Sequence, residues 1–156
     1  MSIERARAHL ARFGLADSII ETEHSSATVE LAAAAVGTQP ERIAKSLSFL
    51  VDGSPVLVVT AGDARVDNHK FRQRFAVKPR MIPAEDVQSL VGHAVGGVCP
   101  FGVEPGVQVY LDESLRRFET VFPACGNDRS AVELPVPALQ AASGSVGWVD
   151  VCRIPG

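Results

Sequence analysis

The 156-residue sequence has little of what usually staples a small protein together. Its three cysteines, Cys99, Cys125 and Cys152, form no Cys-x-x-Cys pair. An odd number at wide spacing excludes a disulfide framework and a cysteine zinc site. The four histidines are scattered without metal-ligand spacing, so we expect no metal. The cysteines are therefore interpreted as small buried side chains.

Common catalytic motifs are missing as well. There is no Gly-x-Ser-x-Gly nucleophile elbow, because the nearest run, Gly144 to Gly147, is one residue short. Neither glycine-rich phosphate loop, Gly-x-x-x-x-Gly-Lys-Ser/Thr or Gly-x-Gly-x-x-Gly, occurs. We therefore expect no cofactor, and any enzymatic site has to work without a side-chain triad.

Long apolar runs and a strong charge of one sign are also absent. No stretch approaches eighteen apolar residues, and residues 1–10 carry charges where a secretory signal needs an apolar core. Fifteen basic and eighteen acidic residues give a net charge of −3, which argues against coating long nucleic acids or an anionic membrane but leaves a small contact open. We expect a cytoplasmic protein with no membrane partner.

Hydrophobic periodicity predicts one α+β domain over residues 1–156. Thr28, Asn68 and Pro83 are candidate starts of helices, as N-cap, N-cap and first helical residue. Asp52-Gly53 is expected to turn a β-hairpin between apolar runs. Helices are predicted near 3–13, 29–36, 69–76, 84–92 and 136–143, and further strands over 107–112, 118–124, 131–136 and 146–152.

The stretch 92–106, GHAVGGVCPFGVEPG, is the most unusual in the sequence. It holds five glycines and two prolines. Glycine lets the backbone approach a ligand and turn bare N–H groups toward it, and such groups stabilise an oxyanion. A plain connection between a helix and a strand is the alternative.

Two basic features accompany this loop. Lys45 begins an apolar strand, either as a solvated end residue or as an anion binder at a pocket rim. Residues 65–80 hold six basic side chains and one acidic one. That segment is either a footprint for a few phosphates or a solvated helix face.

The order of these pieces resembles the YbaK/EbsC and prolyl-tRNA synthetase editing-domain family of aminoacyl-tRNA deacylases. The resemblance covers about residues 20–152 and rests on AKSLSF (44–49), AGDARVD (61–67), GHAVGGVCPFG (92–102), YLDESL (110–115) and ACG (124–126). It implies a twisted, mixed and mostly antiparallel sheet of about six to seven strands with flanking helices.

The resemblance also implies a site for the 3′ aminoacyl-adenosine of a mischarged tRNA. The family's Gly-x-x-x-Pro loop matches 96–100, and its strand lysine matches Lys45. The catalytic group would then be Gly96, Gly97, Pro100 and Lys45. Substrate-binding residues would be Ser46, Val98, Cys99, Phe101, Gly102 and Gly126, and tRNA phosphate contacts would be Lys45, Arg65, Lys70 and Arg72.

The implied function is a freestanding deacylase that removes a small wrong amino acid from tRNA, with tRNA(Pro) the expected substrate and a synthetase a potential partner. Loop N–H groups would hold the carbonyl oxygen while the adenosine hydroxyl assists the attacking water. Ser46 matches neither the asparagine of an alanyl-specific branch nor the threonine of the cysteinyl one, and Cys125 stands where Gly-Ala-Gly is expected. A covalent role for Cys99, a noncatalytic module that binds a tRNA end or an acyl nucleotide, and hydrolysis of another acyl ester are the alternatives.

Overall fold

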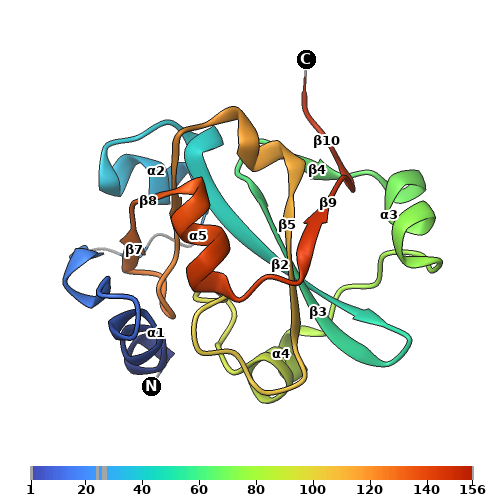
Figure 1. Cartoon of the computed structure of the whole chain (residues 1–156), viewed down its shortest axis with the longest axis horizontal. Coiled ribbons are helices and arrows are strands. Elements are labelled where there is room, and N and C mark those ends of the chain that lie inside the picture. The colour runs from blue at the N-terminus through green and yellow to red at the C-terminus, as the bar shows by residue number, and fades with distance from the viewer. Residues whose placement is uncertain (1, 24, 26–27, 156) are drawn as a thin grey trace.

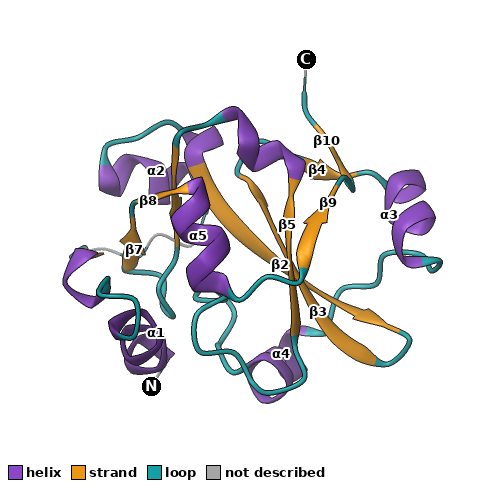
Figure 2. Ribbon diagram, viewed as in Figure 1, coloured by secondary structure: helices purple, strands orange, loops and turns teal. Residues whose placement is uncertain are grey.

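The computed structural model describes residues 2–23, 25 and 28–155. A central sheet runs through the middle of the molecule, with helices on its flanks (Figures 1 and 2). Its strands, given in chain order, are β2 (Ile43–Val51), β3 (Ser54–Ala61), β5 (Gln108–Asp112), β6 (Thr120–Pro123), β8 (Leu134–Pro135) and β9 (Gly147–Val149). They lie side by side in the order β8-β6-β2-β3-β5-β9. The predicted single α+β domain with a mixed sheet is confirmed.

The β2–β3 hairpin is the longest pairing of this sheet and confirms the predicted Asp-Gly turn. Its antiparallel register closes at Val51 and Ser54. Asp52 has φ 51° and Gly53 has φ 79°, the two positive values that a type I′ turn requires. The backbone twist of such a turn matches the right-handed twist of the two flanking strands.

The remaining pairings are of both kinds. β6 and β8 are antiparallel, whereas β2–β6, β3–β5 and β5–β9 are parallel. Two small antiparallel sheets pair β1 (Ile19–Glu21) with β7 (Ser130–Val132) and β4 (Arg65–Val66) with β10 (Cys152–Arg153). Over the described residues, four of the seven strand pairings are thus antiparallel, although three of the five within the central sheet are parallel.

Over the residues that the structure describes, five helices and three 3₁₀ turns complete the fold. Thr28 caps α2 as predicted, because its hydroxyl accepts the Leu31 N–H at 3.1 Å. The predicted Asn68 cap is wrong by one residue: Asp67 accepts the Lys70 N–H at 3.0 Å and Asn68 begins the helix. Pro83 is the N-cap of α4 and not, as was predicted, its first helical residue. The elements are α1 (Ser2–Ala11), α2 (Val29–Val36), α3 (Asn68–Phe75), α4 (Ala84–Val91), α5 (Val136–Ser143), η1 (Ala16–Ser18), η2 (Pro40–Arg42) and η3 (Glu113–Arg117).

Two predicted strands are each divided in the structure. The run 131–136 becomes β7 and β8, and α5 begins at Val136 because prolines flank this residue, cannot donate ladder hydrogen bonds and suit a first helical turn. The run 146–152 becomes β9 and β10 in different sheets. Between them, Val151 donates its N–H to Asp112 Oδ1 at 2.9 Å and accepts the Asp67 N–H at 2.8 Å.

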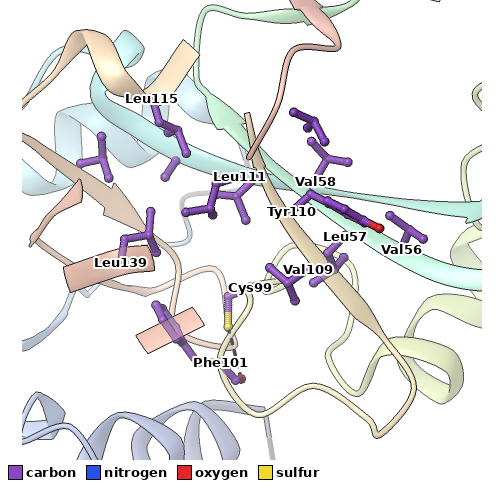
Figure 3. Packing of buried hydrophobic residues seen from close by; sticks show 14 of the residues in the cluster. Val56, Leu57, Val58, Cys99, Phe101, Val109, Tyr110, Leu111, Leu115 and Leu139 are labelled. Carbon is purple, nitrogen blue, oxygen red and sulfur yellow. Dashed lines mark hydrogen bonds between the residues drawn. The ribbon is translucent and has the colours of Figure 1, made fainter. Parts of the chain in front are cut away.

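The core lies against β3 and β5. Leu57, Val58 and Val59 are completely buried, and Leu111 packs beside them. Figure 3 shows Leu57, Val58 and Leu111 together with Cys99 and Phe101, which come from the glycine-rich stretch. The stretch is therefore attached to the core of the protein, and this attachment fixes where its remaining residues lie.

Candidate functional site

A gap in the hydrogen bonding of β2 creates the candidate site. β2 pairs with β6 at Ile43↔Phe122 and Ala44↔Pro123, where proline has no N–H to continue the ladder. Farther along β2, the Ser48 carbonyl accepts the Ile82 N–H at 3.1 Å. Between these two partners the edge of β2 around Lys45 and Ser46 faces a cavity.

The cavity has a volume of about 380 Å³. One wall comes from α2, through Val29 and Ala32, and another from α4 and the residues before it. The remaining sides are closed by Val95, Gly96 and Val98 of the glycine-rich stretch and by parts of the segment 124–131. Most of the lining is apolar, and polar groups are contributed by Lys45, Ser46, Asn127 and Asp128, among others. This size and this mixture are typical of a small-molecule site.

Lys45 is held by the chain that follows β3. Its Nζ donates to the Ala64 carbonyl at 2.6 Å and to the Gly62 carbonyl at 3.2 Å. An ammonium group has three donors, so one N–H is left for a ligand. Burial lowers the pKa of Lys45 below its ordinary value, and this effect outweighs the opposing influence of Cys152 and Asp63. Lys45 is thus a positioned, partly desolvated donor.

Ser46 offers a hydroxyl group with no partner. Its Oγ is buried and makes no hydrogen bond with any residue that the structure describes. A buried hydroxyl without a partner costs free energy, about 1–3 kcal/mol. Because Ser46 lines the cavity, a bound ligand is able to supply the missing hydrogen bond.

Gly96 is the point at which the glycine-rich stretch meets the cavity. Residues 94–97 form a turn in which the Gly97 N–H donates to the Ala94 carbonyl at 3.0 Å. Gly96 is exposed and has φ 95°, as the third residue of a type II turn does. Within the described part of the chain its N–H has no hydrogen-bond acceptor, whereas that of Gly97 is already used. Of the two glycines, Gly96 is therefore the available donor.

Gly97 is buried against the segment after β6. A Cβ atom added at Gly97 would lie 2.5 Å from the carbonyl carbon of Gly126 and 2.6 Å from Cα of Asn127. Both contacts are with backbone, which cannot yield easily. Gly97 thus lets its loop pack closely on the backbone at Gly126 and fixes the wall of the cavity, and neither glycine is among the residues that line it.

The next residues of the stretch belong to the core. Cys99, Pro100 and Phe101 are buried, and Phe101 is directed toward the same cluster as Leu139 and Val109 (Figure 3). Gly102 donates its N–H to His9 Nδ1 at 3.0 Å and accepts from Arg5 Nε at 2.9 Å. The predicted substrate contacts therefore divide into two groups: Ser46 and Val98 line the cavity, whereas Cys99, Phe101, Gly102 and Gly126 lie behind its wall.

Buried thiols provide no nucleophile here. Burial raises the pKa of the Cys99 thiol to about 12, and burial also raises the pKa of the Cys125 thiol. The Cys99 thiol also lies 3.7 Å from the Phe101 carbonyl, which it faces as a donor. A thiol that is not ionised is a poor nucleophile, so the geometry does not favour the covalent alternative.

The predicted phosphate contacts are spread over the surface. Lys70 binds Asp150 at 3.0 Å and the Cys152 carbonyl at 3.0 Å. Arg72 is exposed on α3, which lies on the other side of the molecule from the α2 wall (Figure 1). Arg65 is nearer, since its charge contributes to the lowered pKa of Lys45. Arg65 also faces Arg153 across the β4–β10 pair, where two like charges meet.

Sequence reasoning did not identify the α2 wall or the turn after β6 as parts of the site. Val29 and Ala32 read as an ordinary apolar helix face in the sequence. Asn127 and Asp128 directly follow the Ala-Cys-Gly segment, and this adjacency was the available signal. Asn127 Oδ1 accepts the Arg129 N–H at 2.9 Å and the Ser130 hydroxyl at 2.8 Å, which fixes the turn.

No three His, Cys, Asp and Glu side chains among the described residues come together as a metal site would require. None of the described helices has the length and apolar character needed to cross a membrane.

Similar proteins are known. Residues 23–142 match the family model of the aminoacyl-tRNA editing domain. Over 154 residues, the chain is 49% identical to the uncharacterized protein YwhH of Bacillus subtilis (strain 168), covering 98% of each chain. It is 30% identical over 100 residues to the proline–tRNA ligase of Geobacillus sp. (strain WCH70), covering 64% of this chain and 17% of the ligase.

The fold has a close solved counterpart. A crystal structure of a proposed trans-editing enzyme for prolyl-tRNA synthetase superposes with a TM-score of 0.87 at 30% identity. The match covers 99% of this chain and 98% of the other.

Proposed function

Because the chain belongs to the aminoacyl-tRNA editing domain family, we propose that it is a freestanding hydrolase that cleaves the ester between a mischarged small amino acid and tRNA. The observation that carries this proposal is that Lys45 and Gly96 line one cavity of about 380 Å³. A cation and an unused backbone N–H are the groups that an acylated, phosphate-bearing RNA end needs. Hydrolysis of the ester releases the free amino acid and the tRNA.

Gly96 supplies the oxyanion contact in this proposal. Attack of water on the ester places negative charge on the carbonyl oxygen, and the free Gly96 N–H donates to it. One such donor contributes roughly 10²- to 10³-fold in rate, about 2.7–4 kcal/mol. Gly97 supports this donor from behind, because its own N–H holds the turn closed. Pro100 also supports this donor, because it is buried and its ring fixes the backbone next to the turn.

Lys45 anchors the substrate and does not act as the base. Two of its three donors bind the Gly62 and Ala64 carbonyls, and the third is directed to the terminal phosphate or sugar of the RNA. The free hydroxyl of the terminal adenosine orients the attacking water. No side chain is covalently modified, in keeping with the high thiol pKa of Cys99.

The cavity sets the size of the acyl group. Val29, Ile43 and Phe122 give it apolar walls, and Ser46 gives it one hydroxyl without a partner. A missing methylene changes binding by only about 1–3 kcal/mol, so synthetases mischarge tRNA with smaller or isosteric amino acids. A pocket of this kind, separate from the amino-acid site of the synthetase, hydrolyses the mischarged esters and so releases the wrong amino acids.

The tRNA itself is expected to be tRNA(Pro), supplied by a synthetase that mischarged it in the cytoplasm. Support comes from the proline–tRNA ligase relatives and from the trans-editing counterpart. Arg65 is the predicted phosphate contact nearest to Lys45, and Arg153 beside it extends the same positive surface. Lys70 and Arg72 make at most outer contacts.

A panel of Ala-, Cys-, Ser- and Thr-tRNA(Pro) tests the proposal. We expect the purified protein to deacylate at least one of them well above the spontaneous rate. Lys45→Ala should slow that reaction by roughly 10- to 100-fold, because a hydrogen bond from a charged group is worth about 1.5–3 kcal/mol. Lys78→Ala removes the same charge from an exposed position outside the cavity and is the matched control.

Two results would contradict the proposal. Tight binding of the mischarged tRNAs without hydrolysis of any would favour a noncatalytic binding module instead. Full activity of Lys45→Ala would remove this cavity from the reaction even if the protein is a deacylase.

A further inference from the structure

The cavity contains one acidic side chain that the mechanism above does not use. Among the described residues that line it, Lys45 and Asp128 are the two with ionisable side chains. Lys45 comes from β2, and Asp128 comes from the turn between β6 and β7. The cavity therefore offers a ligand one positive and one negative group.

Asp128 lies directly beside the proposed oxyanion donor. A Cβ atom built on Gly96 would be 3.7 Å from the Cβ of Asp128, and apart from Gly96 and its two chain neighbours no other described atom lies within 4 Å of that position. The Asp128 carboxylate accepts a hydrogen bond from the Ser25 hydroxyl through Oδ2. None of the ion pairs between described residues involves it. Oδ1 thus remains available to a donor from a ligand.

We propose that Asp128 binds the α-ammonium group of the aminoacyl ester, and this inference rests on the function proposed above. In that ester the α-nitrogen and the carbonyl oxygen are separated by three covalent bonds of about 1.2–1.5 Å each. A carbonyl oxygen held by the Gly96 N–H therefore brings the α-nitrogen next to the residue beside Gly96. That residue is Asp128.

Charge makes this contact selective. A protonated amine bound in an apolar cavity loses water and needs a charged acceptor, and carboxylate–ammonium hydrogen bonds are roughly twice as strong as neutral ones. An acyl group whose nitrogen is blocked, or replaced by a hydroxyl, cannot make this contact. Asp128 thus restricts the site to esters of free amino acids and disfavours N-acylated and peptidyl esters.

A pair of substrates that differ only at the α-position tests the assignment. Alanyl-tRNA carries the ammonium group, and lactyl-tRNA has a hydroxyl in its place. Single-turnover rates are measured for both and divided by the spontaneous rate of each. Asp128→Asn should slow the alanyl reaction by roughly 10- to 100-fold and leave the lactyl reaction nearly unchanged.

Glu30→Gln provides the matched control. It changes the net charge by the same amount from an exposed position on α2, close enough to Lys45 to act on it electrostatically but outside the cavity lining. We expect this variant to treat both substrates as the unmodified protein does. A loss limited to Asp128→Asn and to alanyl-tRNA then cannot be a general effect of charge on tRNA binding.

Other outcomes overturn the assignment. An equal loss on both substrates would place Asp128 on the attacking water or in the fold, and no loss on either would show that it does not touch the acyl group. If the unmodified protein hydrolyses neither these two esters nor any other aminoacyl-tRNA of the panel, the proposed function fails. Affinities for 3′-alanylamido- and 3′-lactylamido-adenosine then decide the role of Asp128 separately, because Asp128→Asn should weaken the first alone.

Discussion

Residues 95–98 and residues 99–102 are the exposed half and the buried half of the central part of the glycine-rich stretch. They behave differently although they are continuous in sequence. In residues 95–98, Val95, Gly96 and Val98 line the cavity, and both Val95 and Gly96 are exposed there. Residues 99–102 enter the core and bind α1, through the contacts of Gly102 with His9 and Arg5. One half is available to a ligand, and the other half holds it in place.

This difference explains how a site without a catalytic triad is kept in position. A backbone N–H can stabilise an oxyanion only if its direction is fixed before the substrate arrives. The buried half provides that fixation, because Cys99 and Phe101 anchor one end of the turn in the core. Gly97 provides it from the side, where it packs on Gly126 and Asn127.

Gly97→Ala is expected to have the largest effect of the variants that probe this comparison. The added methyl group would overlap backbone atoms of Gly126 and Asn127, so we expect the free energy of unfolding to fall by about 1–3 kcal/mol or more. Urea unfolding measures this loss directly. An unchanged midpoint would mean that the two loops are not packed as described.

Gly96→Ala is the matched variant one residue earlier. Its methyl group would meet only the Cβ of Asp128 at 3.7 Å, so the cost is the positive φ of 95°, about 1–2 kcal/mol. Deacylation should nevertheless fall by roughly 100-fold, because a displacement of about 1 Å at a reacting group has an effect of that size. A Gly96→Ala protein that is fully active when folded would separate this residue from the chemistry.

The contact of His93 with the buried half is tested by the pH dependence of the free energy of unfolding. We expect this effect to be the smallest of the three. Its Nε2–H donates to the Phe101 carbonyl at 2.6 Å, while Nδ1 is buried without a partner among the described residues. Burial lowers the pKa of His93 below its ordinary value of 6.5, so the unfolded chain binds a proton that the folded chain does not. The free energy of unfolding should therefore decrease as pH falls below about 6.5, by at most about 1.4 kcal/mol per pH unit.

Chemical denaturation between pH 7.5 and pH 5 measures this slope. His93→Gln keeps a donor for the Phe101 carbonyl and removes the titration, so its slope should be flatter. His69→Gln replaces an exposed histidine and should leave the slope unchanged. The same slope in all three proteins would mean that His93 does not contribute to acid sensitivity.

The sequence was sufficient for the elements whose signals are local. The Asp52-Gly53 turn and the Thr28 cap depend on neighbouring residues, and both are confirmed. Boundaries that depend on tertiary contacts were not predictable. Val151 lies in an apolar run that reads as one strand, but the side chain of Asp112, far away in sequence, takes its N–H and divides the run.

The site was predictable in part, but through the family resemblance and not through local signals. That resemblance implies site roles for Lys45, Ser46, Gly96 and Val98, and the structure brings them to one cavity. Cys99 and Phe101 belong to the same motif, and only the folded structure shows that their side chains pack in the hydrophobic core (Figure 3) and do not line the cavity. Asp128 carries no motif of its own, and its nearness to Gly96 arises from the docking of two loops.

The central claim is that the cavity between Lys45 and Gly96 receives the acylated end of tRNA. Amide chemical shifts on titration with 3′-alanylamido-adenosine, in which a stable amide replaces the ester, test it most directly. We predict the largest shifts at Ser46, Gly96 and Val98, and little change at His93 and Gly102. Shifts centred on Arg65 and Arg153, with Gly96 unchanged, would contradict it.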